Sequence, residues 1–171
     1  MMNVCLENAQ NNLRIQSVNL KESKVFVRDG IDIPTLDRDE TAVQSFRSIV
    51  RVEEISLADP EGGEDIWDYR FIYSAGVRLI FSSEKEESAN DEYKPIVEIV
   101  SVFEAKYLSK SQLKKDEIKA FSADNAGYHV WPYWREYAQS TCARIGLSPA
   151  FEVPVYIVSR KDEKSEADKK A

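Results

Sequence analysis

Strict alternation over residues 67–81 constrains the fold of this chain more than any other feature. The odd-numbered positions are apolar, aromatic or small: Trp67, Tyr69, Phe71, Tyr73, Ala75, Val77, Leu79 and Phe81. Several even-numbered positions are polar: Asp68, Arg70, Ser74 and Arg78. Because successive side chains of a strand point to opposite faces, this pattern predicts a β-strand with one buried and one largely solvated face. Gly76 is expected to mark a β-bulge.

Three weaker patterns predict the other strands. Residues 13–27 alternate with a change of phase, which predicts a strand with a bulge or a short hairpin. Residues 46–57 and residues 93–108 are rich in β-branched and aromatic residues and predict two more strands. The segments between the four strands contain proline, glycine and acidic residues, as connecting loops do. The sequence therefore predicts four strands that pair antiparallel.

The pattern changes to a helical one in the last third of the chain. Residues 112–121 are rich in helix formers and predict a short helix that stops near residues 125–127. Apolar residues then recur at three- and four-residue spacing over 130–145, which predicts a long amphipathic helix. Pro132 either opens that helix in its first turn or kinks a helix that begins near residue 125. Gly146 is expected to cap its C-terminus in the left-handed conformation.

Both ends of the chain are expected to lie outside the folded domain. Residues 1–12 have neither the basic region nor the apolar core of a secretory signal and predict a flexible N-terminus. Residues 151–158 are a last apolar run, in which Pro154 favours an extended segment or an edge strand. Residues 159–171 are almost all charged or small and predict a disordered tail. One folded domain is therefore expected over residues 13–158.

Charge and composition exclude several classes of function. The chain has 23 Lys and Arg against 30 Asp and Glu, a formal charge of −7, so nucleic acid is not an expected partner. It has no apolar run of about 18 residues, which predicts a cytoplasmic protein that does not insert into a membrane. With 2 cysteines and 1 histidine, the chain can form neither a disulfide scaffold nor a zinc cluster of Cys and His.

No residue pattern predicts catalysis. His129 lies beside the aromatic start of the helix, where a structural imidazole is more common than a catalytic one. Cys142 lies on the apolar side of the helix, with no basic neighbour to lower the pKa of its thiol. Gly62 and Gly63 lack the Lys-Ser/Thr pair that follows a phosphate-binding loop. The sequence therefore predicts a protein that is not an enzyme and holds no cofactor and no metal.

Aromatic residues are unusually frequent: 3 Trp, 8 Tyr and 7 Phe. They are concentrated in the strand over 67–81, where the odd positions are expected to fill the core, and in residues 128–134. The second group places large rings on more than one stripe of the helix, which exceeds what one four-stranded sheet can cover. Oligomerisation or a groove for a partner is therefore expected.

Residues 128–156, YHVWPYWREYAQSTCARIGLSPAFEVPVY, resemble the SecB protein-export chaperone family. The family pattern is an aromatic-Pro-Tyr-x-Arg-Glu helix start, a run to Arg-x-Gly, and an apolar stretch that contains proline. Its positions are held here by Pro132, Tyr133, Arg135, Glu136, Arg144, Gly146, Pro149 and Pro154. The order of elements and the first strand, Leu13 to Gln16 with Lys21, are similar too. The resemblance implies an α+β fold: a four-stranded antiparallel sheet followed by a long amphipathic helix.

The resemblance also implies a function. SecB-like proteins are homotetramers, dimers of dimers, whose apolar grooves hold unfolded or nascent polypeptides without nucleotide hydrolysis, in protein export and transport. Such a holdase works because it binds the unfolded state and covers its exposed apolar segments. The resemblance implies these candidate client-binding or oligomer-interface residues: Trp131, Tyr133, Trp134, Tyr137, Phe151, Val153 and Tyr156.

Alternatives remain for the partner and for the function. Export chaperones of this family continue into another helix and a tail that helps to engage the SecA motor, whereas this chain passes into residues 159–171. Shorter SecB-like chaperones protect the antitoxin of a toxin–antitoxin pair, and the chain resembles them at least as well. A third hypothesis is a non-chaperone oligomeric interaction module, in which the aromatic residues only join subunits. An enzyme that uses His129 has little support.

Overall fold

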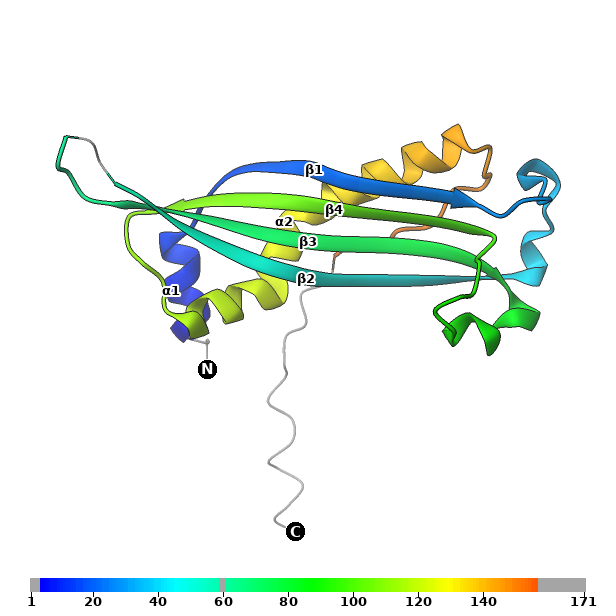
Figure 1. The fold of residues 1–171 in the computed structure, drawn as a ribbon, viewed down its shortest axis with the longest axis horizontal. Helices are drawn as coiled ribbons and strands as arrows, with labels where there is room; N and C mark the ends of the chain where they lie inside the picture. The colour runs from blue at the N-terminus through cyan, green and yellow to red at the C-terminus, as the bar shows by residue number, and fades with distance from the viewer. Residues whose placement is uncertain (1–3, 59–60, 157–171) are drawn as a thin grey trace, which may run out of the picture.

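A four-stranded antiparallel sheet and one long helix make up most of the computed structural model, which describes residues 4–58 and 61–156. The elements are α1 (Val4–Asn12), β1 (Arg14–Val27), β2 (Thr41–Leu57), β3 (Ile66–Phe81), β4 (Val97–Ser109) and α2 (Lys115–Arg144). Short 3-10 turns lie in the connections: Ile33–Thr35, Arg38–Glu40, Ser82–Glu84 and Glu87–Ala89. Figure 1 shows α2 crossing behind the sheet. The predicted α+β fold is confirmed.

The strand order β1-β4-β3-β2 places β3 and β4 in the centre and leaves β1 and β2 as edges. Tyr69 of β3 pairs with Tyr107 of β4, so the odd positions of both strands share one face of the sheet. This face, which we call the helix face, packs against α2: the ring centroids of Phe71 and Phe121 are 5.4 Å apart. The odd positions from Tyr69 to Leu79 are all buried, which confirms the core predicted for this strand.

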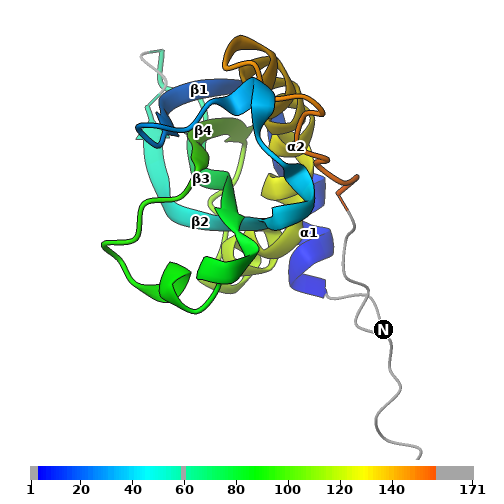
Figure 2. The same cartoon turned by 90° about the vertical axis from the view of Figure 1, so that its right-hand side faces the viewer.

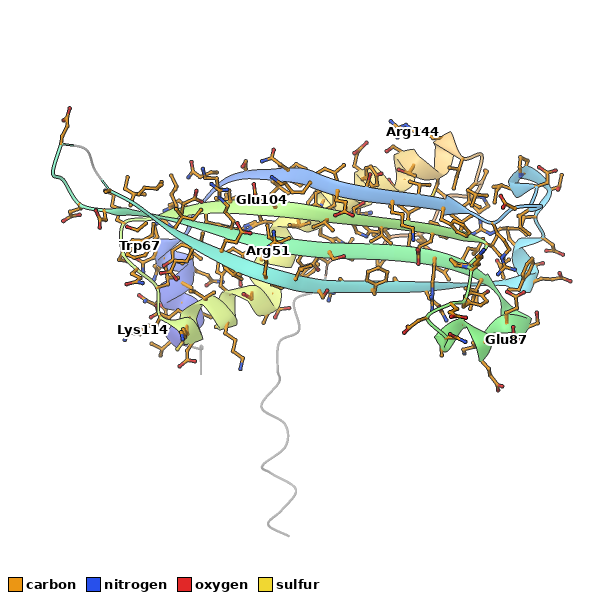
Figure 3. All side chains as sticks on the ribbon, in the orientation of Figure 1. Arg51, Trp67, Glu87, Glu104, Lys114 and Arg144 are labelled. Atoms are coloured by element: carbon orange, nitrogen blue, oxygen red, sulfur yellow. The ribbon has the colours of Figure 1, made fainter. Side chains whose placement is uncertain are left out.

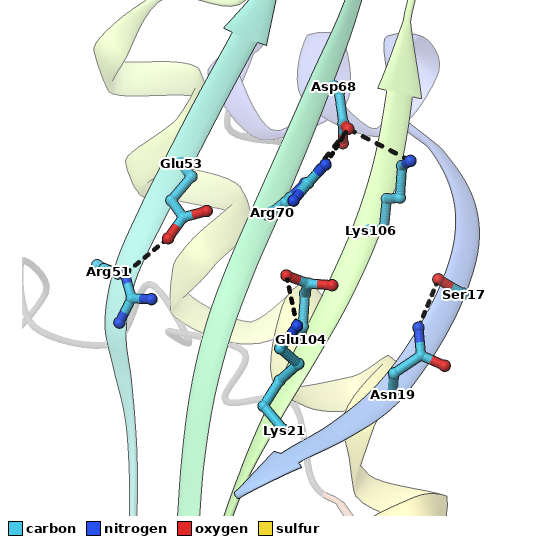
Figure 4. A network of polar contacts seen from close by, with 9 residues as sticks. All are labelled: Ser17, Asn19, Lys21, Arg51, Glu53, Asp68, Arg70, Glu104 and Lys106. Atoms are coloured by element: carbon cyan, nitrogen blue, oxygen red, sulfur yellow. Dashed lines mark hydrogen bonds and ion pairs between the residues drawn. The ribbon is translucent and has the colours of Figure 1, made fainter.

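The opposite face of the sheet, which we call the open face, is less solvated than the alternation predicts. Asp68, Ile72, Gly76 and Ile80 are buried there, Arg70, Ser74 and Arg78 are half-buried, and Ile66 at the start of the strand is exposed. A polar network crosses part of this face (Figure 4). Its central member is Asp68, whose Oδ2 lies 3.0 Å from Arg70 Nη2 and 3.3 Å from Lys106 Nζ.

The expected bulge at Gly76 is wrong, because the pairing register runs through Gly76 on both sides without a shift. A Cβ at Gly76 would collide with the ring of Phe46, its partner on β2. The glycine therefore makes room for an aromatic ring that covers the sheet. The register shifts lie in the edge strands instead, between Ile49 and Arg51 and at two points of β1. The bulge expected in the first strand is thus confirmed.

Two strands begin at other residues than the sequence predicts. β2 begins at Thr41 rather than at residue 46, and β4 begins at Val97 rather than at residue 93. Tyr93 belongs to the connection before β4, where its hydroxyl donates a hydrogen bond to Glu84 Oε2 at 2.5 Å. Polar contacts within the loop therefore hold this aromatic residue, which by composition alone looks like part of a strand.

The helix is single and continuous from Lys115 to Arg144, so the predicted stop near residues 125–127 is wrong. Pro132 is exposed inside the helix and leaves the carbonyl of Tyr128 without its usual helical donor. Packing of the buried side chains on both sides of this point, among them Phe121 and Trp134, holds the helix together. In Figure 1 the helix starts beside α1, below the sheet, and then crosses behind it toward the β1 side.

Gly146 ends α2 as expected. Its φ is 75°, in the left-handed region. The amide of Leu147 donates to the carbonyl of Cys142 at 2.9 Å, and the amide of Gly146 donates to that of Ala143 at 3.3 Å. These two hydrogen bonds are those of a Schellman motif. They turn the chain so that residues 147–156 run back along the helix.

The N-terminal flank differs from the sequence-based prediction, whereas the C-terminal flank takes the extended form that was one of its two predicted alternatives. Residues 1–12 are expected to be flexible, but Val4–Asn12 form α1, which packs on the start of α2 through a 2.6 Å hydrogen bond from Asn8 Nδ2 to Glu117 Oε1. Figure 3 labels Lys114 at this junction. Residues 151–156 form an extended segment and no edge strand. It lies beside α2 in the end-on view of Figure 2. Residues 157–158 and the predicted disordered tail lie outside the described residues.

Candidate functional site

A groove of about 390 Å³ lies at the β2 edge of the sheet, between β2 and the segment after α2. We call it the β2 groove. Its lining comes from four parts of the chain: Val43, Ser45, Phe46 and Arg47 of β2, Gly76 and Val77 of β3, Trp131 and Trp134 of α2, and Glu152, Val153, Pro154 and Val155. The residues that line the groove therefore come together only in the folded protein, from segments that are distant in the sequence.

The groove exists because α2 leaves part of the edge strand uncovered. Val43, Ser45 and Arg47 pair with Leu79, Val77 and Ala75, which places them on the helix face. All three are nevertheless exposed to solvent, and the exposed fraction of Val43 is 52%. On the other side of the groove Val155 is 69% exposed. Two apolar side chains thus stand at the mouth of an apolar groove, next to an edge strand.

Two tryptophans of α2 form the deep wall of the groove. Trp131 and Trp134 are three residues apart, so they lie on the same side of the helix. Their exposed fractions are 8% and 2%. The indole Nε1 of Trp131 donates to the carbonyl of Pro154 at 2.6 Å, which fixes the ring against the C-terminal segment. The groove is therefore walled by side chains that also belong to the core.

Two charged residues, Arg47 and Glu152, line the groove, and Arg47 stands over its aromatic wall. The guanidinium carbon of Arg47 lies 5.3 Å from the ring centroid of Trp131 and 4.3 Å from that of Tyr156. Such stacking is favourable because the face of an aromatic ring is electronegative. Arg47 lies within the strand predicted over 46–57, but nothing in the sequence places its side chain beside the helix.

Tyr156 fills a slot at the inner end of the groove. The slot is formed by Tyr73, Gly127, Trp131 and Arg47, and we call it the Tyr156 slot. A Cβ at Gly127 would lie 2.5 Å from the Tyr156 hydroxyl oxygen and 2.9 Å from that of Tyr73. The two hydroxyls thus lie over Gly127, and burial raises the pKa of both phenols. Gly127, which looks like a helix stop in the sequence, is instead the floor of a side-chain site.

The seven candidate residues fall into two groups. Five are less than 10% exposed: Trp131, Trp134, Phe151, Val153 and Tyr156. Tyr133 is 50% exposed and Tyr137 is half-buried, and neither lines the β2 groove. Three of the five buried residues, Trp131, Trp134 and Val153, line the groove. A role for any of the seven in client binding or assembly stays a prediction.

Comparison with known proteins finds similarity in the fold and not in the sequence. No protein-family model and no curated protein matches the chain. Among solved structures, the Mycobacterium tuberculosis Rv1957 SecB-like chaperone, in complex with a ChAD peptide from the Rv1956 HigA1 antitoxin, matches with a TM-score of 0.60. The match covers 92% of this chain and 99% of that one, at 16% sequence identity. The chain has a SecB-like fold. At this identity the likeness concerns the fold alone.

Two potentially reactive side chains outside the groove, His129 and Cys142, are packed within this SecB-like fold. The hydroxyl of Tyr107 and Nδ1 of His129 share a hydrogen bond of 2.8 Å, and burial lowers the pKa of the imidazole. Cys142 is buried, which raises the pKa of its thiol. Within residues 4–58 and 61–156, no three His, Cys, Asp or Glu side chains come together as a metal site. None of the helices described there is long and apolar enough to cross a membrane.

Protonation of His129 is expected to destabilise the protein. Because the pKa of His129 is lowered in the folded state, the unfolded chain binds more protons below about pH 6.5, and stability falls as the pH falls from there toward the lowered pKa. The variant His129→Asn keeps a hydrogen-bonding group for the Tyr107 hydroxyl and removes the titrating ring. Urea unfolding of both proteins at about pH 7.5 and about pH 5.5 measures the effect.

The expected result is a smaller loss of stability in the variant than in the wild type over this interval. Glu84 and Glu117 have pKa values that are lowered by their hydrogen bonds to Arg28 and to the Lys114 amide, so their contributions are lost at more acidic pH. Equal losses in both proteins would show that His129 is not the group that titrates.

Proposed function

We propose that this protein is an ATP-independent holdase chaperone that keeps unfolded or nascent polypeptides soluble, in the context of protein export or transport. The β2 groove is the observation that carries the proposal. It is apolar, exposed at its mouth and bordered by an edge strand whose outer side has no strand partner in the described part of the chain. An extended polypeptide can pair with such an edge while placing alternate side chains in the groove.

The SecB-like fold supports this proposal. The similar chaperone from Mycobacterium tuberculosis was solved in complex with a peptide of an antitoxin. That complex also favours a second candidate function, in which the chain is a dedicated chaperone of one antitoxin in a toxin–antitoxin system. The two functions share a peptide-binding surface and differ in the number of partners.

Assembly is part of the proposal. Ile15, Leu20 and Val25 pair with inward-facing residues of β4, yet their exposed fractions are 44%, 44% and 43%. They form an apolar row on the helix face of the other edge strand, β1. Apolar rows of this kind favour burial between subunits. We propose a homotetramer, a dimer of dimers, in which such rows are covered by other copies of the chain.

Light scattering on a sizing column tests both statements. The protein is measured alone and then with reduced, carboxymethylated α-lactalbumin, which stays unfolded and soluble. We expect a mass four times the subunit mass of 19.6 kDa and co-elution of the unfolded protein with it. Native α-lactalbumin is the matched control and is expected to elute separately, because its apolar segments are buried.

Comparison of several unrelated unfolded proteins separates the candidate functions. A general holdase captures most of them with similar affinity. A dedicated antitoxin chaperone captures none of them and binds one antitoxin encoded beside it. An assembled protein that binds neither kind of chain would contradict both functions and favour the oligomeric interaction module.

A further inference from the structure

The segment over residues 151–156 packs against the domain as a bound peptide does. It is extended and belongs to no helix or strand. Phe151, Val153 and Tyr156 are buried, whereas the three residues between them are exposed. Its carbonyl at Pro154 accepts a hydrogen bond from the Trp131 indole. Anchoring through separated side chains and few backbone hydrogen bonds is how extended peptides bind to grooves.

The Tyr156 slot has the features of a tyrosine-recognition site. Trp131 packs edge-on against the ring, with centroids 5.4 Å apart, and Arg47 covers it at 4.3 Å. The hydroxyl of Tyr73, on the sheet, lies at the same end of the slot as that of Tyr156, over Gly127. Glycine is a poor helix former, yet Gly127 lies inside α2 where a Cβ would collide with both hydroxyls. Apart from Tyr156 itself, the whole slot belongs to the sheet and to α2.

The slot and the β2 groove are continuous. Trp131 and Arg47 line the groove and also contact the ring of Tyr156. A polypeptide that lies in the groove beside β2 therefore reaches the two side chains that hold Tyr156. A polypeptide in the groove and the resident Tyr156 therefore compete for the same faces of Trp131 and Arg47.

We propose that the Tyr156 slot is a binding site for a tyrosine carried by an extended apolar peptide, and that residues 152–156 are its resident occupant in the free protein. An incoming peptide of this chemistry displaces the resident segment and places its own tyrosine between Trp131 and Arg47. This inference rests on the proposed function, because it assigns the ligand class and the regulation of the same groove.

Binding of a synthetic peptide tests the slot directly. The probe is the acetylated peptide PAFEVPVY, which has the sequence of residues 149–156, and the control peptide ends in alanine instead of tyrosine. Full-length Tyr156→Ala has an empty slot and is expected to bind the probe with a change in tryptophan fluorescence. The wild type is expected to bind the probe at least about tenfold more weakly than Tyr156→Ala, because its slot is occupied.

Two further variants keep the test independent of folding. Tyr156→Phe retains the ring in the slot and loses only the hydroxyl, so its affinity for the probe is expected to lie closer to that of the wild type than to that of Tyr156→Ala. Val50→Ala removes an exposed apolar side chain of β2 that does not line the groove, and it is expected to bind as the wild type does. Equal binding of both peptides by Tyr156→Ala, or binding of the probe by Tyr156→Phe as strong as that by Tyr156→Ala, would overturn the proposal.

Client capture distinguishes this inference from the proposed function. If both hold, Tyr156→Ala captures unfolded α-lactalbumin at lower concentration than the wild type. Probe binding without client capture would retain the slot and contradict the holdase. Client capture without tyrosine-dependent probe binding would retain the holdase and overturn the slot.

Discussion

Replacing Trp134 with alanine is expected to lower the free energy of unfolding by about 3–5 kcal/mol. Trp134 is 2% exposed and lies between α2 and the sheet, beside the β2 groove. Removing the indole leaves a cavity that the surrounding side chains, held by a continuous helix and a paired strand, cannot close. Urea unfolding followed by far-ultraviolet circular dichroism measures the loss without relying on the fluorescence of the missing ring.

The neighbouring aromatic residue is the matched control. Tyr133 precedes Trp134 in the same helix and is 50% exposed, so Tyr133→Ala is expected to change the stability by less than about 0.5 kcal/mol. If Tyr133 lies at a subunit interface, light scattering will instead show a smaller mass for this variant at unchanged subunit stability. Equal unfolding midpoints for Trp134→Ala and the wild type would contradict the core role of Trp134.

The strands could be predicted from the sequence because their signal is local. Alternation from Trp67 to Phe81 results directly from the two-residue period of a strand, and both the strand and its buried face are observed. The interpretation of Gly76 is wrong for a tertiary reason: the ring of Phe46, far away in the sequence, occupies the space of the missing side chain. No local pattern contains that information.

The helix and the groove show the same limit more strongly. Gly127 and Pro132 are helix breakers by propensity, but packing against the sheet overrides propensity over the whole of α2. Of the aromatic residues near residue 131, Trp131 and Trp134 line the β2 groove, and their role in binding stays a prediction. Which of these aromatic residues are buried, as Trp131 and Trp134 are, and which are exposed, as Tyr133 is, depends on where residues 151–156 lie. This segment folds back over the helix after Gly146. The β2 wall of the groove depends on strand order, which a single sequence does not give.

A negative charge at the mouth of the β2 groove is expected to remove most of the binding of unfolded chains. Val43 lines the groove and is 52% exposed, so an aspartate in its place remains hydrated in the free protein. An apolar segment that enters the groove would have to strip water from this carboxylate without offering a hydrogen-bond donor in return. We expect Val43→Asp to weaken capture of unfolded α-lactalbumin about tenfold or more, which corresponds to about 1.4 kcal/mol.

Val50→Asp controls for every other effect of the substitution. Val50 lies on the same strand, has nearly the same exposure at 53%, and does not line the groove. Both variants gain the same charge, and both place in β2 a residue with low strand propensity. Fluorescence anisotropy with labelled, carboxymethylated α-lactalbumin compares them at one ionic strength. A loss confined to Val43→Asp assigns the clients to the groove, whereas equal losses would mean that general charge repulsion weakens capture and that the groove only serves packing.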